Sequence, residues 1–354
     1  MTIKLELFSK KPMAQLIFKD GTTFEGKSFG YSKSTSGEVV FSTGMVGYPE
    51  FITDPSYKDQ ILVLTYPLIG NYGVPPSSRW ESDRIYLAGV IVSNYIDTPS
   101  HIESTQTLAK WFKAQKVPAL VVKDTRYITQ KIRLEGSMLG KIVVEQDVEY
   151  EDPNEKNLVA EVSTSRLRVG GKGEKHIILI DCGAKRAIGA NLLKRGLRVT
   201  TVPWDFDFLE KKINFDGIVI SNGPGDPKKA DKTIQIVRKL LTMRIPILGI
   251  CLGNQILTLA AGGDTQKLKF GHRGQNQPCI QVGTKRCYLT TQNHGYVVSR
   301  IPDGFEPWFI NANDGTVEGI IHKSKPFMSV QFHPESTPGP VDTEWIFDYF
   351  LKRI

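Results

Sequence analysis

The sequence predicts an α/β protein with two domains, and three observations support this prediction. The chain has 354 residues, whereas single domains commonly hold roughly 100–200. Strand-like patterns dominate residues 1–150, while strands and helices alternate along residues 176–354. A polar connecting segment, residues 151–175, separates the two patterns. We therefore expect a mixed α/β N-terminal domain, a linker, and a C-terminal domain with a mostly parallel sheet and flanking helices.

The N-terminal domain begins with a predicted hairpin, because the turn dipeptide Asp20-Gly21 follows the apolar run 15–18. Three more short apolar runs, each bounded by turn residues, predict strands at residues 38–41, 61–66 and 88–92. One helix is predicted over residues 105–115, where Leu108, Trp111 and Phe112 share one face.

The C-terminal domain shows a regular strand–helix rhythm. Strands are predicted at residues 176–180, 199–202, 217–221 and 245–250. Helices are predicted around residues 190–195 and 233–243, and an apolar stripe after Cys251 predicts a third. The run at 176–180 is nearly all apolar, as in a strand buried on both faces. This alternation favours a parallel sheet with helices on both sides.

Composition argues against several other classes of protein. The net charge is +8, but Lys and Arg are scattered, which favours a mildly basic surface over a nucleic-acid site. No apolar run approaches the ~20 residues of a membrane span, and residues 1–7 lack a signal-peptide core. The four cysteines form no C-x-x-C pair, so we expect reduced thiols and no metal site. We expect a cytoplasmic protein that binds neither nucleic acid nor membrane.

Cys251 occupies a position typical of a nucleophile. It follows an apolar strand, precedes a helical stripe, and lies in the pattern Gly249-x-Cys251-x-Gly253, the cysteine counterpart of a nucleophile elbow. The N-terminus of a helix favours a thiolate, and its free N–H groups can bind an oxyanion. A small buried structural cysteine fits the same pattern. This motif alone therefore leaves both interpretations open.

Two further segments could complete a site around Cys251. A thiol nucleophile needs a base and a group that orients the base, and His333-Pro334-Glu335 places an imidazole and a carboxylate on one side of the chain. The turn that contains Gly223 and Gly225 follows the strand at 217–221, at the edge where α/β sheets bind ligands. Taken singly, each segment is better explained as an ordinary turn.

Together these three segments resemble the class I, or triad, glutamine amidotransferases. The resemblance implies that Cys251 is the nucleophile and that His333 and Glu335 are the other triad members. It also implies that the backbone N–H groups of Gly225 and Leu252 form the oxyanion hole.

The N-terminal half resembles one member of this family, the small, glutaminase subunit of carbamoyl-phosphate synthetase. The motif sequences are most similar to those of eukaryotic forms. The similar segments are residues 37–41, 43–50, 53–57, 64–73, 292–296 and 331–335. The resemblance implies a set of residues that contact glutamine: Ser56, Gly223, Gly225, Leu252, Gln255, Asn293, Gly295 and Tyr296. His294 is expected to be structural, because His333 fills the role of the base.

By the same resemblance, the chain hydrolyses glutamine and delivers ammonia to a large synthetase partner, for pyrimidine or arginine biosynthesis or both. The chain contains no ATP-binding motif, so ATP, bicarbonate and magnesium are expected at that partner, with no cofactor in this chain. A non-catalytic regulatory subunit of the same complex is the alternative.

Two features depart from the family. Asn254 stands where a histidine is usual, so we expect a different local hydrogen-bond arrangement. Residues 187–189 also differ from the family pattern, and we expect this to affect helix packing more than chemistry. Residues 1–13 have no counterpart in the family and are expected to be an extension.

Overall fold

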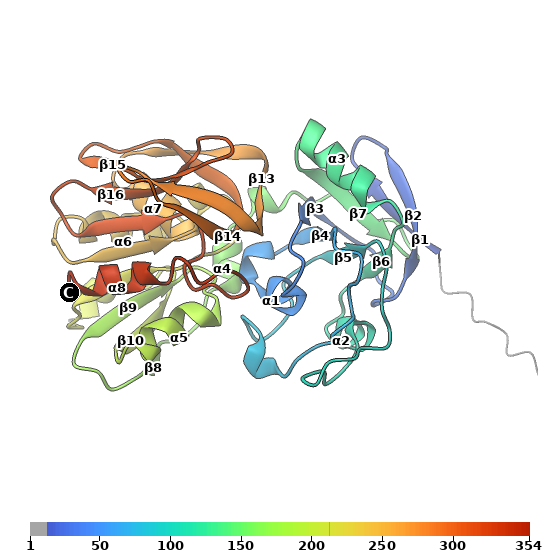
Figure 1. Ribbon diagram of the computed structural model, residues 1–354, viewed down its shortest axis with the longest axis horizontal. Coiled ribbons are helices and arrows are strands. Elements are labelled where there is room, and N and C mark those ends of the chain that lie inside the picture. Colours follow the sequence, from blue (N-terminus) through green and yellow to red (C-terminus); the bar gives the residue numbers. More distant parts are fainter. Residues whose placement is uncertain (1–12, 212) are drawn as a thin grey trace, which may run out of the picture.

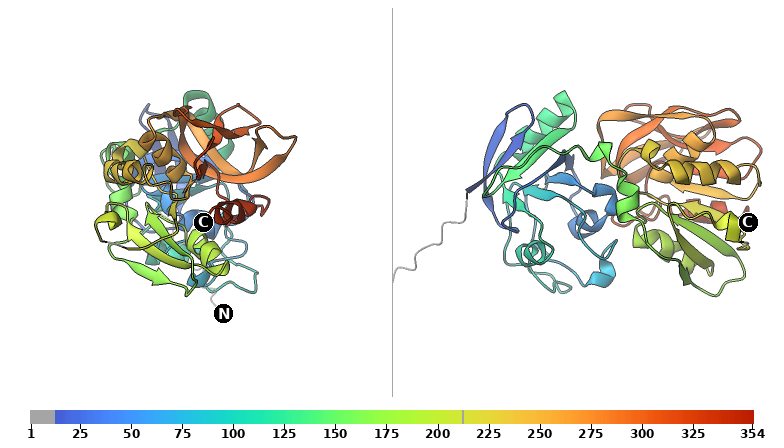
Figure 2. Two further views of the ribbon diagram at one scale, coloured as in Figure 1. Left: turned by 90° about the vertical axis from the view of Figure 1, so that its left-hand side faces the viewer. Right: turned by 180° about the vertical axis from the view of Figure 1, so that it is seen from behind.

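The computed structural model describes residues 13–211 and 213–354, which form two lobes side by side (Figure 1). The view from behind shows the same two lobes (Figure 2). The expected N-terminal extension lies outside the described residues, apart from Met13, which begins the first strand.

The N-terminal lobe is a closed barrel with the strand order β1-β2-β6-β5-β4-β3-β7. Its strands are β1 (Met13–Phe18), β2 (Thr23–Ser28), β3 (Thr35–Ser42), β4 (Gln60–Leu64), β5 (Gly89–Val92), β6 (Ala119–Val121) and β7 (Met138–Val143). Its helices are α1 (Tyr48–Thr53), η1 (Pro55–Tyr57), η2 (Ser77–Arg79), α2 (Leu108–Ala114) and α3 (Thr125–Glu135). The predicted hairpin is confirmed as the antiparallel pair β1–β2, and the other predicted elements correspond to β3, β4, β5 and α2.

Helix α2 illustrates how the sequence specifies this lobe. The Thr107 side chain accepts a hydrogen bond from the Lys110 N–H and caps the helix, while Leu108, Trp111 and Phe112 are buried. These apolar residues pack in one cluster with the buried side chains of α1. A second cluster is formed by other buried side chains of the barrel strands, which pack against Ile128 and Ile132 of α3.

The C-terminal lobe contains a ten-stranded sheet with the order β14-β13-β15-β16-β17-β12-β11-β9-β10-β8. Its strands are β8 (Arg168–Gly170), β9 (His176–Asp181), β10 (Arg198–Pro203), β11 (Gly217–Ile220), β12 (Ile247–Ile250), β13 (Asp264–Gln281), β14 (Cys287–Arg300), β15 (Phe305–Asn311), β16 (Val317–His322) and β17 (Phe327–Val330). Its helices are α4 (Leu158–Val162), α5 (Arg186–Lys194), η4 (Phe208–Lys211), η5 (Pro227–Lys229), α6 (Asp231–Leu240), α7 (Leu252–Ala260) and α8 (Trp345–Leu351).

The centre of this sheet is parallel, as the alternating pattern predicts. Strands β10, β9, β11, β12 and β17 run parallel, and β8 and β13–β16 extend the sheet with antiparallel pairing. The antiparallel extension was not expected, because β13 is largely polar and its pairing with β14 shifts register three times. Those bulges remove the alternating pattern by which a strand is recognised.

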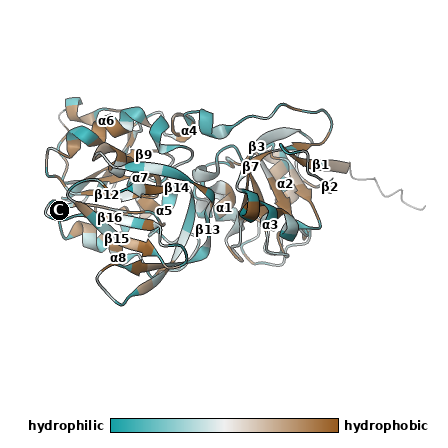
Figure 3. Ribbon diagram, turned by 90° about the horizontal axis from the view of Figure 1, so that it is seen from above, coloured by the Kyte–Doolittle hydropathy of each residue, from teal (hydrophilic) through white to brown (hydrophobic). Residues whose placement is uncertain are grey.

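Helices cover both faces of the parallel centre. Along β11, Ile218 and Ile220 pack in a cluster with α4, α6 and α7, while Val219 packs in a cluster with α5 and α8. Apolar residues accordingly gather in the strands of both lobes (Figure 3). Among the described residues, no helix is long and apolar enough to cross a membrane.

The segment expected as a linker, residues 151–175, is partly built into this lobe. It holds η3 (Pro153–Glu155), α4 and β8, and β8 pairs with β10 at the edge of the sheet. Polar residues dominate the segment, but Leu158, Val159 and Val162 bury one side of α4. These three apolar side chains of α4 therefore anchor a segment whose polar composition predicts a linker.

Candidate active site

Cys251 lies at a sharp turn between β12 and α7, as the elbow motif predicts. Its backbone angles are φ 54° and ψ −103°, a conformation that costs energy for a residue with a side chain. The flanking glycines permit this turn. A Cβ on Gly249 would lie 2.4 Å from the Gly253 carbonyl oxygen, and a Cβ on Gly253 would lie 2.2 Å from the Ile220 carbonyl oxygen. This turn places the Cys251 sulfur at the N-terminus of α7.

His333 and Glu335 form a buried pair in the same lobe. The His333 Nδ1 atom lies 2.6 Å from Glu335 Oε1, and both residues are almost fully buried. Burial alone would lower the pKa of His333, but the Glu335 carboxylate and the Cys251 sulfur raise it to about 10. In the described part of the chain, the His333 Nε2 atom has no hydrogen-bond partner. Because the Cys251 sulfur helps to raise the His333 pKa, this ring nitrogen is the atom available to exchange a proton with the nucleophile.

Lys185 is a buried cation that the sequence did not single out. Its Nζ atom lies 2.9 Å from Glu335 Oε1, and both side chains are excluded from solvent. Burial would raise the pKa of Glu335, but Lys185 and His333 lower it to about 2. The carboxylate therefore stays ionised and can hold the His333 imidazole. The available signal was the position of Lys185, which lies four residues after the apolar strand β9 (His176–Asp181) and occupies the N-cap position of α5.

The predicted substrate contacts all line one pocket beside Cys251. Its lining includes every one of them: Ser56, Gly223, Gly225, Leu252, Gln255, Asn293, Gly295 and Tyr296. Ser56 comes from the N-terminal lobe, so both lobes form the pocket. His333 and Glu335 lie behind Cys251 and do not line it. The roles of these residues stay predictions.

Asp54 connects the two lobes at this pocket. Its carboxylate accepts hydrogen bonds from the Asn222 amide at 3.3 Å and the Asn293 amide at 3.1 Å. Asn222 also donates to the Ser56 hydroxyl at 2.8 Å. Asp54 and Asn222 lie within motifs noted in the sequence, but only the fold shows that they position Ser56 and Asn293.

Arg273 is another residue of the pocket lining that the sequence did not indicate. It is 5% exposed, and burial lowers the pKa of its guanidinium. Its Nη1 atom donates to the Phe270 carbonyl oxygen at 2.6 Å. Nearby, the Lys267 ammonium of the C-terminal lobe lies 2.6 Å from the Glu38 carboxylate of the barrel. Glu38 also lines the pocket and neutralises Lys267, so the buried Arg273 guanidinium is the charge that suits an anionic group on a ligand.

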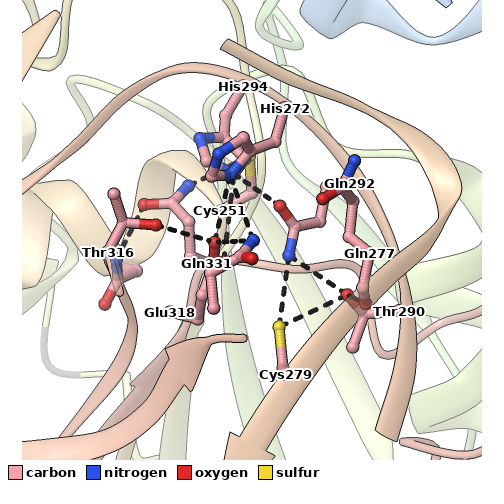
Figure 4. Close-up of polar contacts among 12 residues, drawn as sticks. Cys251, His272, Gln277, Cys279, Thr290, Gln292, His294, Thr316, Glu318 and Gln331 are labelled. Carbon is pink, nitrogen blue, oxygen red and sulfur yellow. Dashed lines mark hydrogen bonds and ion pairs between the residues drawn. The ribbon is translucent and has the colours of Figure 1, made fainter. Parts of the chain in front are cut away.

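A buried polar cluster lies close to Cys251 (Figure 4), and one of its members, His294, also lines the pocket. Ligand atoms of His272, His294 and Glu318 lie within 4.8 Å of one another, but the ring nitrogens of both histidines already have polar partners. His272 Nδ1 lies 3.1 Å from Glu318 Oε1, and the two nitrogens of His294 lie near the Tyr296 carbonyl and the Gln292 side chain. This cluster was not predicted. The structural role expected for His294 stays a prediction.

Comparison with known families agrees with this geometry. Residues 178–353 match the class I glutamine amidotransferases. Residues 16–142 match the carbamoyl-phosphate synthase small chain, CPSase domain. The chain therefore belongs to the carbamoyl-phosphate synthase small-chain family, with a class I glutamine amidotransferase domain as its second half.

Three curated relatives illustrate the similarity. The chain is 49% identical to the multifunctional protein CAD of Squalus acanthias, over 96% of this chain and 16% of that protein. It is 47% identical to the human mitochondrial carbamoyl-phosphate synthase [ammonia], over 98% of this chain and 24% of that protein. It is 44% identical to the multifunctional protein URA2 of Saccharomyces cerevisiae, over 97% of this chain and 18% of that protein. The chain thus spans less than a quarter of the length of each relative.

Proposed function

We propose that this chain hydrolyses glutamine to glutamate and ammonia at Cys251, and that the ammonia serves carbamoyl phosphate synthesis on a large synthetase component. The observation that supports this proposal is the strained Cys251 elbow, which faces a pocket from both lobes and has the buried His333–Glu335 pair behind it. A cysteine kept only for packing would not require this backbone strain.

The first half of the reaction forms a thioester. The Cys251 thiolate attacks the side-chain amide carbon of glutamine, and a tetrahedral oxyanion forms. The backbone N–H groups of Leu252, at the first position of α7, and of Gly225 donate to this oxyanion. Gly225 adopts φ 81°, a conformation open to glycine, in the turn that lines the pocket. His333 gives its proton to the departing nitrogen, the C–N bond breaks, and ammonia leaves.

The second half releases glutamate. His333, now neutral, takes a proton from water, and the oxygen attacks the thioester carbon. The C–S bond breaks, and its electron pair returns to Cys251. Glu335 keeps the imidazole in one orientation, and Lys185 keeps Glu335 ionised.

The synthetase component would bind ATP, bicarbonate and magnesium, and would consume the ammonia. The three relatives are each more than four times longer than the aligned region, and the human one is named a carbamoyl-phosphate synthase. Their length is consistent with a synthetase region beside the part that this chain matches. A cytoplasmic location and the pyrimidine or arginine pathway stay predictions.

A non-catalytic regulatory role is the second candidate, because the human relative is named for ammonia. The two roles differ in whether Cys251 reacts. With the chain joined to its synthetase component, Cys251→Ser should lower glutamine hydrolysis by roughly 10⁴-fold or more. Carbamoyl phosphate synthesis from added ammonia should persist, because the variant leaves the synthetase unchanged. Glutamine hydrolysis that survives in the variant would reject the proposed mechanism, and wild-type protein without hydrolysis would favour the regulatory role.

A further inference from the structure

Gln331 makes a direct contact with the nucleophile that the triad does not explain. Its side-chain Nε2 atom lies 3.7 Å from the Cys251 sulfur, within hydrogen-bonding distance for sulfur. Gln331 is fully buried and directly follows β17, the strand next to β12 in the sheet. Figure 4 shows Gln331 beside Cys251. An N–H that points at this sulfur is a donor available to a thiolate.

The orientation of the Gln331 amide is fixed by its neighbours. Its Oε1 atom accepts hydrogen bonds from Asn254 Nδ2 at 2.9 Å and from Gln255 Nε2 at 3.2 Å. Two donors can face only the oxygen of the amide, so the NH₂ group must face the sulfur.

The two donors are themselves fixed. Asn254 Oδ1 accepts from the Ser329 hydroxyl at 2.8 Å, so the Asn254 NH₂ group turns to Gln331. The Gln255 Nε2 atom also donates to the Tyr296 carbonyl oxygen at 2.7 Å. Ser329, Asn254 and Gln331 therefore form a directed chain of donors that ends at Cys251. All three residues are completely buried, so water does not compete for these bonds.

We propose that Gln331 is a further catalytic residue that donates a hydrogen bond to the Cys251 sulfur, and that Asn254 and Ser329 are positioning residues that orient it. The proposal rests on the glutaminase function proposed above. It also gives a role to Asn254, which stands where the family usually has a histidine. A histidine N–H at this position could donate to the same Gln331 oxygen.

The contact matters most when the sulfur carries charge. Sulfur is anionic before attack and again when the C–S bond of the thioester breaks, whereas it is neutral within the thioester. A fixed N–H donor therefore stabilises the leaving thiolate during hydrolysis more than it stabilises the thioester. Loss of this donor should slow hydrolysis of the thioester and raise its steady-state amount.

A second glutamine–cysteine contact provides a matched comparison (Figure 4). The Gln292 Nε2 atom lies 3.3 Å from the Cys279 sulfur, and both residues are fully buried. Cys279 has no elbow and no catalytic histidine, and burial raises the pKa of its thiol. The same substitution at Gln292 therefore tests what removal of a buried N–H···S contact costs when the sulfur is not the nucleophile.

The test compares Gln331→Glu with Gln292→Glu in the full chain with its synthetase component. The glutamate at 331 keeps an acceptor for Asn254 and Gln255 but removes the N–H. We expect kcat for glutamine hydrolysis to fall roughly 10- to 100-fold, with a much smaller change in KM and more trapped glutamyl thioester. Gln292→Glu should keep kcat within about threefold. Asn254→His should retain activity, and Asn254→Leu should lose part of it.

A second measurement does not depend on glutamine turnover. Alkylation of Cys251 by iodoacetamide at mildly acidic pH, followed by peptide mass spectrometry, should be slower in Gln331→Glu than in the wild type. Wild-type kcat, thioester level and alkylation rate in a folded Gln331→Glu protein would overturn the proposal. If the wild type hydrolyses no glutamine, the proposed function fails, and the alkylation rates still decide whether the contact acts on the sulfur.

Discussion

Replacing Lys185 with methionine should destabilise the protein strongly and alter the acid limb of its activity. The Lys185 ammonium and the Glu335 carboxylate lie 2.9 Å apart, with side chains 2% and 0% exposed. Methionine has a similar length but no charge. The variant therefore leaves the buried Glu335 carboxylate with His333 but without its ammonium partner.

The structure sets the size of this effect. Breaking a buried ion pair by removing one partner typically costs about 3–5 kcal/mol of the free energy of unfolding. The lowering of the Glu335 pKa from 4.5 to about 2 corresponds to roughly 3 kcal/mol, to which both Lys185 and His333 contribute. Since this pKa is lowered in the fold, the stabilisation is present above pH 4.5 and is lost as the pH falls toward 2. We expect a loss of about 3 kcal/mol at neutral pH.

Urea unfolding monitored by tryptophan fluorescence measures this loss, and Lys228→Met is the matched control. The Lys228 ammonium lies 2.8 Å from the Asp264 carboxylate, but these side chains are 52% and 45% exposed. The same substitution at this exposed pair should cost less than about 1 kcal/mol. In Lys185→Met, glutamine hydrolysis should also decline at a higher pH on the acid side, because Glu335 takes up a proton more readily. Equal unfolding curves for the two variants, with a wild-type pH profile, would refute this account of the triad.

Three further results are expected. Gly253→Ala should abolish glutamine hydrolysis in protein whose folding is confirmed by circular dichroism, because the added Cβ would lie 2.2 Å from the Ile220 carbonyl oxygen. An active variant would contradict the elbow geometry. Ser56→Ala should raise KM for glutamine more than it lowers kcat, and a fall in kcat alone would argue against a binding role. Burial would lower the pKa of His272, but Glu318 and Asp314 raise it above 6.5. The stabilisation of the fold by this imidazolium is therefore complete below pH 6.5 and is lost as the pH rises through the raised pKa. Unfolding across this pH range should therefore be less pH-dependent in His272→Gln, and an unchanged dependence would refute that ion pair.

The sequence was sufficient for the parts of the site that lie within short motifs. The elbow of Cys251 follows from two glycines and a strand–helix change, and His333 and Glu335 are separated by a single proline. Local spacing sets these features, so they can be read without the fold. The parallel centre of the sheet was predictable for the same reason, because most of its strands are short apolar runs and β10 is a short run of β-branched residues between turns.

The remaining site residues depend on contacts between distant segments. Lys185 pairs with Glu335 across 150 positions, and Asn293 reaches Asp54 across 239. A single sequence gives no direct signal for such pairs. Gln331 was visible in its motif, but its role depends on which way its amide points, and Asn254 and Gln255 determine that orientation.

The most direct test of the central claim is covalent labelling with a chloroketone analogue of glutamine, followed by peptide mapping. The account predicts one adduct, on Cys251, which forms rapidly and is prevented by added glutamine. Cys279 is buried and Cys287 is exposed, so they serve as internal controls for thiol reactivity. An adduct found on Cys287 rather than Cys251, or labelling of Cys251 that glutamine does not slow, would contradict the assignment of Cys251 as the glutaminase nucleophile.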